Sequence, residues 1–167
     1  KWLPKSSDSE ERKPRFDIII IAGDVSFGLR VAPVLSWYDL DPAVVKYVGT
    51  SQWMAASILQ EPSLTGGWFA AQPADQAAQF QSLWQATYNT AASKYAIMAF
   101  DAVALVSTLP NQNTLKLRNA LTTGTGFNGY SGAFKLNSNG QNFRHLEIRE
   151  IKTGRFDVVV PAKTRFN

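Results

Sequence analysis

The sequence feature that most constrains the fold is the run of four isoleucines in RFDIIIIAGDVSFG, residues 15–28. Four consecutive β-branched residues favour an extended chain over a surface helix. A short, continuous apolar run that closes with Ala-Gly is typical of a strand buried on both faces, and such strands occur mainly in parallel sheets. The sequence therefore predicts an α/β protein with a central, fully buried strand at about residues 17–22.

The segments that follow alternate as expected for an α/β fold. Expected strands at 44–49 and 66–71 alternate with expected helices at 27–38 and 75–88. The next helix, at 95–109, is apolar on nearly all sides, so we expect it to be deeply buried. After Gly124 the chain becomes glycine-rich and extended, with turn signals between strand-like runs, which predicts an antiparallel β meander. The predicted fold class is α/β, with a parallel-sheet lobe followed by a C-terminal antiparallel meander.

Composition narrows the possible chemistry. The chain has no cysteine, which excludes disulfides, thiolate metal ligands and a cysteine nucleophile. No apolar run reaches the roughly 18 residues that a membrane-spanning helix needs. Residues 111–167 hold nine basic and three acidic side chains. This basic region could face nucleic acid, lipid head groups or an acidic partner, but its alternation of charged and apolar residues favours solvated β hairpins.

The motifs of common enzymes are missing. GDVSFG has neither the glycine spacing of a dinucleotide loop nor the Gly-Lys-Ser/Thr ending of a phosphate loop. His145 is the only histidine, so an ordinary metal site lacks ligands, and no G-x-S-x-G elbow exposes a serine. We therefore expect no catalytic residue, no metal ligand and no cofactor, and we expect that the protein is not an enzyme.

Asp101 lies inside the most apolar predicted helix. A buried carboxylate must be paired or hydrogen-bonded. It could be an acid of a binding site or a hinge, or it could hold backbone amides of a neighbouring loop. We favour the second interpretation.

Polar residues also follow two predicted parallel strands, and these are the candidate ligand-binding residues. Asp24 follows the first strand, and Thr50, Ser51 and Trp53 follow the second. Because the carboxyl ends of parallel strands meet at one edge of a sheet, both loops should lie beside a cleft. Asp24 could receive an ammonium or a sugar hydroxyl, Thr50 and Ser51 could donate to a carboxylate, and Trp53 could stack on a ligand. The alternative is ordinary loop chemistry, with Asp24 capping the next helix.

The succession of segments carries a resemblance to a known family. The segments are FDIIIIAG, YVGTSQW, LTGGWFAAQP, FQSLWQATYNT, AFDAVAL, GFNGYSGAFKLNSNG and HLEIREIKTGRF. In this order they resemble the C-terminal half of a type I periplasmic binding protein of the leucine/isoleucine/valine-binding class. APVLSWYDLDP and EPSLTGGWFAA make the chain most similar, within that class, to penicillin-binding-protein activator-like lipoproteins.

The resemblance implies two α/β lobes joined by three crossovers, with a ligand cleft between them. Residues 1–15 are polar, charged and interrupted by two prolines, so we expect a linker or surface loop there. The resemblance makes residues 16–92 part of the second lobe. Residues 93–167 would be the buried helix and the C-terminal strands returning toward the first lobe. Most of the first lobe would be missing, so we expect that lobe or a dimer partner to cover exposed apolar surface. Phe100 stands where the family usually has tyrosine.

Two functions follow from the resemblance. The first is a periplasmic lipoprotein that regulates peptidoglycan synthesis by contacting a peptidoglycan synthase. The second is the solute-binding component of an ABC uptake transporter, which would bind a small polar ligand such as an amino acid in the cleft and dock on a permease. Either would reach the membrane only through an upstream lipid anchor, and neither involves nucleic acid.

Overall fold

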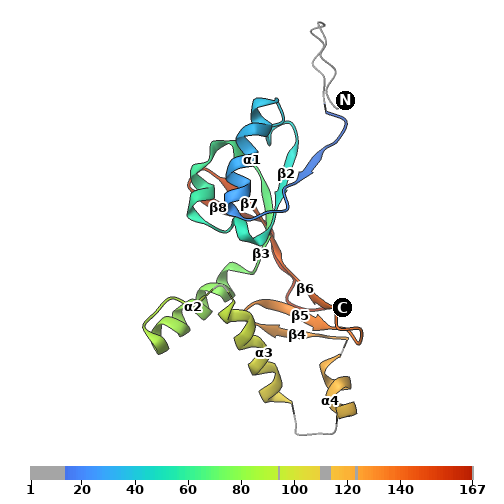
Figure 1. Ribbon diagram of the computed structural model, residues 1–167. Helices are drawn as coiled ribbons and strands as arrows, with labels where there is room; N and C mark the ends of the chain where they lie inside the picture. Colours follow the sequence, from blue (N-terminus) through green and yellow to red (C-terminus); the bar gives the residue numbers. More distant parts are fainter. Residues whose placement is uncertain (1–13, 94, 110–113, 123, 167) are drawn as a thin grey trace, which may run out of the picture.

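The computed structural model describes residues 14–93, 95–109, 114–122 and 124–166, and these form two connected parts. One part, called here the sheet lobe, contains a five-stranded sheet with helix α1 beside it (Figure 1). The other, called the helical part, contains helices α2, α3 and α4 and a three-stranded sheet (Figure 1). Most of the predicted linker at 1–15 lies outside the described residues.

The five-stranded sheet begins with the predicted parallel strands and ends with two antiparallel ones. Its order is β1 (Ile18–Ile20), β2 (Lys46–Gly49), β3 (Trp68–Ala71), β7 (Glu147–Lys152) and β8 (Arg155–Val160). β1, β2 and β3 pair in parallel, whereas β7 pairs antiparallel with β3 and with β8. The prediction of an α/β fold with a parallel-sheet lobe is therefore confirmed.

The core of the sheet lobe lies between one face of this sheet and the segments that cover it. These segments are α1 (Val25–Trp37) and the 3-10 turns η1 (Ser51–Trp53), η2 (Ala56–Gln60) and η3 (Pro62–Leu64). The buried residues are Ile21, Ala32, Tyr47, Trp53, Ile58, Leu64, Phe69, Ala71 and Ile151. Burial raises the pKa of the Tyr47 phenol, whose hydroxyl donates to the carbonyl of Leu40.

The isoleucine strand lies at the edge of the sheet, and the prediction of a central strand buried on both faces is wrong for this chain. β1 pairs only with β2 among the described strands. Ile21 is buried on the α1 side, but Ile18 and Ile20 point the other way and are 56% and 73% exposed. The composition of the run is that of a doubly covered strand. The described residues cover only one of its faces.

The helical part packs three helices beside an antiparallel sheet. The helices are α2 (Ala74–Tyr88), α3 (Ala96–Thr108) and α4 (Thr114–Leu121), and the strands are β4 (Phe127–Gly129), β5 (Gly132–Leu136) and β6 (Asn142–Arg144). Phe80 of α2, Phe100 of α3 and Tyr130 form a cluster with ring centroids 5.5–5.8 Å apart.

Helix α3 is less buried than its composition predicts. Its buried residues are Ile97, Asp101 and Leu105, which form a single stripe at helical spacing. Val103 and Val106 on other sides of the helix are 70% and 62% exposed. The expectation of deep burial is therefore wrong among the described residues.

The predicted meander is divided between the two sheets. β4, β5 and β6 form the sheet of the helical part, whereas β7 and β8 complete the sheet of the sheet lobe. Three segments join the two parts: 72–73, 145–146 and the tail after Val160, which returns to the helical part (Figure 1). There the Phe166 ring stacks on His145, with 4.1 Å between the ring centroids.

Within the described ranges, no helix is both long and apolar enough to cross a bilayer.

Candidate functional site

The structure brings together the two loops that the sequence singled out. The Thr50 hydroxyl donates to the carbonyl of Gly23 at 3.1 Å, which ties the loop after β2 to the loop after β1. The backbone N–H of Ile21 also donates to the carbonyl of Val48 at 2.9 Å. These loops, 22–24 and 50–54, form one edge of the sheet lobe, called here the rim.

Asp24 caps helix α1 from the rim. Its Oδ1 accepts a hydrogen bond from the backbone N–H of Phe27 at 2.8 Å, which satisfies one of the free amides of the first turn. The side chain is exposed, so the carboxylate also faces solvent. The helix-capping alternative considered for Asp24 is therefore seen in the structure.

Thr50 and Ser51 are placed differently. The Thr50 hydroxyl makes two local contacts, because besides donating to Gly23 it accepts from the backbone N–H of Gln52 at 3.3 Å. Ser51 begins η1 and is exposed. Of the two hydroxyls, that of Thr50 is therefore already used to shape the rim.

Trp53 lies beneath the rim and not on it. Its side chain is fully buried, and its indole packs against the backbone at Gly28 and Gly49. A Cβ on Gly49 would lie 2.2 Å from the ring, so only glycine lets the ring come this close. The buried indole Nε1 has no hydrogen-bond partner. In this conformation Trp53 packs the core and has no free face on which a ligand could stack.

We expect Gly49→Ala to destabilise the sheet lobe, because the new methyl group must displace Trp53 or β2. Overpacking a well-packed core costs about 1–3 kcal/mol in the free energy of unfolding. Urea unfolding followed by tryptophan fluorescence measures this. Gly124→Ala is the matched control, since a Cβ there meets nothing within 4 Å. Equal stability of the two variants would contradict the tight packing of Trp53.

A buried ion pair connects the rim to the joining segment 72–73, and it was not predicted from the sequence. Arg149 Nε contacts the Glu147 carboxylate, and the two side chains are only 6% and 7% exposed. The Arg149 guanidinium also donates to Met54 Sδ at 3.1 Å and to the Gln72 carbonyl at 3.2 Å. A signal was present in the sequence, because Glu147 and Arg149 share the period-two register of buried Ile151.

Asp101 organises the loop between β4 and β5. Its carboxylate accepts hydrogen bonds from the backbone N–H of Tyr130 at 2.9 Å and of Ser131 at 2.7 Å, and from the Ser131 hydroxyl. A Cβ on Gly129 would lie 2.4 Å from the carboxyl carbon, so the loop closes directly over this acid. The prediction that Asp101 holds backbone amides of a neighbouring loop is confirmed.

Arg144 completes this network. It donates to the Ser131 hydroxyl, so a chain of hydrogen bonds runs from Arg144 through Ser131 to Asp101. Burial lowers the pKa of the Arg144 guanidinium, and the nearby charge of Asp101 opposes that shift. The network is structural, since each polar group contacts another part of the same chain.

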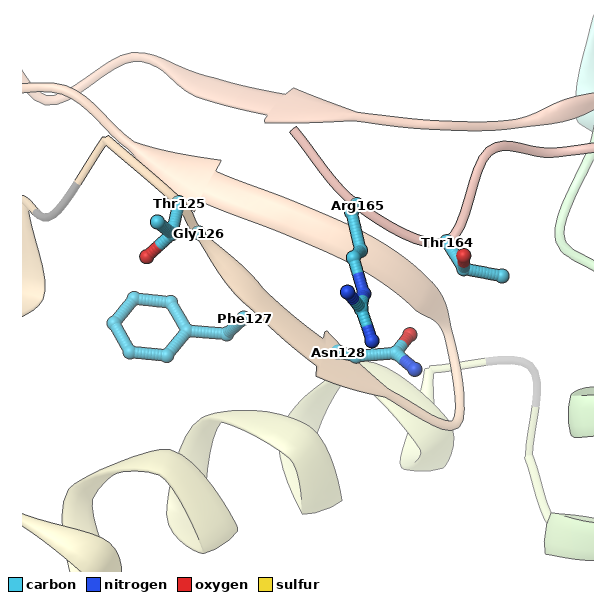
Figure 2. Close-up of a pocket in the computed structure, with 6 residues that line it drawn as sticks. All are labelled: Thr125, Gly126, Phe127, Asn128, Thr164 and Arg165. Atoms are coloured by element: carbon cyan, nitrogen blue, oxygen red, sulfur yellow. The ribbon is translucent and has the colours of Figure 1, made fainter. Parts of the chain in front are cut away.

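Two adjacent cavities lie where the C-terminal tail crosses the helical part. One, of about 440 Å³, is lined by Thr125, Gly126, Phe127, Asn128, Thr164 and Arg165 (Figure 2). The other, of about 320 Å³, lies between the start of α2 and the tail and shares Asn128 and Thr164 with the first. Neither cavity includes Asp24, Thr50, Ser51 or Trp53. Among the described side chains, no group of three or more acids or histidines is arranged to hold a metal ion.

Comparison with solved structures identifies the fold. A Rhodospirillum rubrum protein described as a branched-chain amino acid ABC transporter superposes with a TM-score of 0.70 at 17% identity, over 86% of this chain and 44% of its own. The substrate-binding protein LivJ of Streptococcus pneumoniae, in complex with isoleucine, superposes with a TM-score of 0.56 at 18% identity, over 89% of this chain and 46% of its own. The C-domain of LpoA from Haemophilus influenzae, a regulator of PBP1A, superposes with a TM-score of 0.61 at 17% identity, over 90% of this chain and 46% of its own.

The fold is therefore that of a type I periplasmic binding protein, as the resemblance implied. No family model and no curated protein sequence matches the chain. The chain spans less than half the length of these three structures. These neighbours include both transporter components and a regulator, so the shared fold does not choose between the two functions.

Proposed function

We propose that this chain is part of a non-enzymatic, periplasmic binding-protein-like lipoprotein that regulates peptidoglycan synthesis through contacts with a synthase. In this proposal a lipid anchor attaches the protein to the membrane. The structural similarity to the LpoA C-domain supports this proposal, because that protein is a regulator of PBP1A.

The observation that carries the proposal is the state of the rim. A solute-binding lobe needs polar groups that are free to clamp a ligand and an apolar surface for its side chain. Here the Asp24 carboxylate caps α1, the Thr50 hydroxyl joins two loops, and Trp53 is fully buried. Most of these groups therefore stabilise the rim itself and are not free to bind a ligand. This suits a protein that acts through its outer surface.

The alternative is the binding component of an amino-acid uptake transporter. Exposed Ser51 and the solvent-facing side of Asp24 favour it, since a hydroxyl and a carboxylate could hold the two charged ends of an amino acid. The similarity to the LivJ complex with isoleucine supports the same alternative.

Two binding measurements on the full-length protein separate these functions. Isothermal titration with each proteinogenic amino acid tests solute capture, and biolayer interferometry with a class A penicillin-binding protein of the same organism tests regulation. We expect no calorimetric heat from amino acids and saturable binding of the synthase. Asp24→Asn serves as the matched variant, because an asparagine still caps the helix and removes only the charge.

Tight binding of one amino acid that weakens in Asp24→Asn would establish the transporter alternative. Absence of synthase binding would contradict the proposed regulation. Synthase binding that is unchanged in Asp24→Asn would place the contact away from the rim, as the proposal expects.

A further inference from the structure

The two cavities beside the C-terminal tail form one groove with a marked chemical asymmetry. They share Asn128 and Thr164, so they are continuous along the tail. The wall opposite the tail is strand β4, and Figure 2 shows the Arg165 side chain extending from the tail toward Asn128 on that strand. We call this the tail groove. It lies where the helical part meets the end of β8, and no residue of the rim lines it.

The two cations of the tail groove, Lys163 and Arg165, have no hydrogen-bond or ion-pair partner among the described residues. Both side chains are exposed. By contrast, the half-buried Arg144 contacts Ser131, and the buried Arg149 contacts Glu147. An unpaired guanidinium in a groove is a ready donor for a carboxylate, which it can bind through two parallel hydrogen bonds.

The groove also offers main-chain and apolar contacts. β4 pairs only with β5 among the described strands, which leaves the backbone groups along its other side without a strand partner. Such an edge can add an extended peptide. The second cavity supplies apolar wall from Pro73, Ala133, Val158 and Pro161. Its one acidic side chain, Asp75, lies at the start of α2, in the cavity that Arg165 does not line.

The groove is anchored at its far end. Phe166 stacks on His145 and lies under Lys135, whose Nζ is 5.3 Å from the ring centroid. The tail is thus held at Phe166, and Lys163 to Arg165 bridge between that contact and the end of β8. An occupant can therefore meet a preformed wall, which lowers the ordering cost of binding.

From these features, we propose that the tail groove binds an extended, acidic segment of a protein partner. A carboxylate side chain of the segment would contact Arg165 in the first cavity, and a small aliphatic side chain would fill the apolar wall of the second. This deepens the proposed function, because it assigns a surface and a chemical class to the contact with the partner.

Fluorescence anisotropy on the whole chain tests this with a defined probe. The probe is a fluorescein-labelled decapeptide of alternating glutamate and valine, and its control peptide has glutamine at every glutamate position. We expect saturable binding of the glutamate peptide, at least tenfold tighter than the glutamine peptide. Because exposed charge pairs are screened by salt, affinity should fall steeply between low salt and physiological ionic strength.

The variant that decides the matter is Arg165→Gln. Loss of one charge-assisted hydrogen-bonded contact should lower the affinity for the glutamate peptide by about tenfold. Arg30→Gln is the matched control, since Arg30 is an exposed arginine of α1 in the other part of the molecule. Equal melting temperatures of both variants and the natural chain exclude misfolding as the cause.

The results separate the groove from simple charge attraction and from the wider function. Equal losses in Arg165→Gln and Arg30→Gln, equal binding of the two peptides, or full competition by succinate at the peptide's own concentration would each overturn the proposal. So would failure of both peptides to bind. If the synthase binds equally well to Arg165→Gln, the groove proposal fails while the regulatory function stands. If the peptide binds the groove but no synthase binds the protein, the regulatory function fails alone.

Discussion

Replacing Asp101 with alanine should cost about 3–5 kcal/mol in the free energy of unfolding, the range expected when a buried charged group that satisfies several donors is removed. The variant leaves the backbone N–H groups of Tyr130 and Ser131 without their acceptor. It also removes the charge that Arg144 faces through Ser131. Urea unfolding of the whole chain, followed by circular dichroism, measures the change.

Two further variants make this expectation specific. Asp17→Ala removes an exposed carboxylate of the same type and should change stability by less than about 0.5 kcal/mol. Gly129→Ala reaches the same network from the opposite side, since its Cβ would lie 2.4 Å from the Asp101 carboxyl carbon, and it should be strongly destabilising. If Asp101→Ala proves no worse than Asp17→Ala, Asp101 does not hold the loop.

Arg149→Ala should destabilise the chain by about 3–5 kcal/mol, because it leaves the Glu147 carboxylate buried without a partner. The variant also removes the hydrogen bonds that Arg149 donates to the Gln72 carbonyl, in the joining segment 72–73, and to Met54 Sδ at the rim. Equilibrium unfolding by urea, monitored by tryptophan fluorescence, gives the free-energy difference from the natural chain.

The double variant Glu147→Leu with Arg149→Met removes both charges of the pair and keeps most of the side-chain volume. Replacing both partners of a buried pair with apolar residues of similar size is often neutral or stabilising. We therefore expect the double variant to recover most of the stability lost in Arg149→Ala. A double variant as unstable as the single one would show that the guanidinium contacts with Gln72 and Met54, and not the unpaired carboxylate, account for the loss.

The sequence predicts the order of elements well because its periodic signals are local. Expected strands at 44–49 and 66–71 and the helix at 75–88 appear as β2, β3 and α2, each within two residues at either end. The role of Asp101 was also predictable, since a carboxylate in an apolar helix has few ways to be satisfied. These inferences depend on neighbours along the chain or on the general cost of burial.

The errors concern contacts between distant segments. The isoleucine run and α3 have the composition of elements covered on all sides, and composition does not say whether the covering residues are present in this chain. The burial of Trp53 could not be predicted from its place after a strand, because it depends on the space that Gly28 and Gly49 leave for the ring. The alternating pattern of the meander does not say which sheet each strand joins, because antiparallel hairpins and pairing with β3 use the same pattern.

The pairing of β3 with β7 has a consequence for how the chain is made. The sheet lobe is finished only when residues after Glu147 join a strand that ends at Ala71, and Ile151 then enters the core beside Tyr47 and Phe69. Because the chain emerges from its N-terminal end, those last strands become available only after β3 and the whole of the helical part have emerged. During that interval β3 has an open edge, and the nascent chain is most exposed to wrong pairings. A chaperone that shields this edge should therefore raise the yield of folded protein more than one that acts after release.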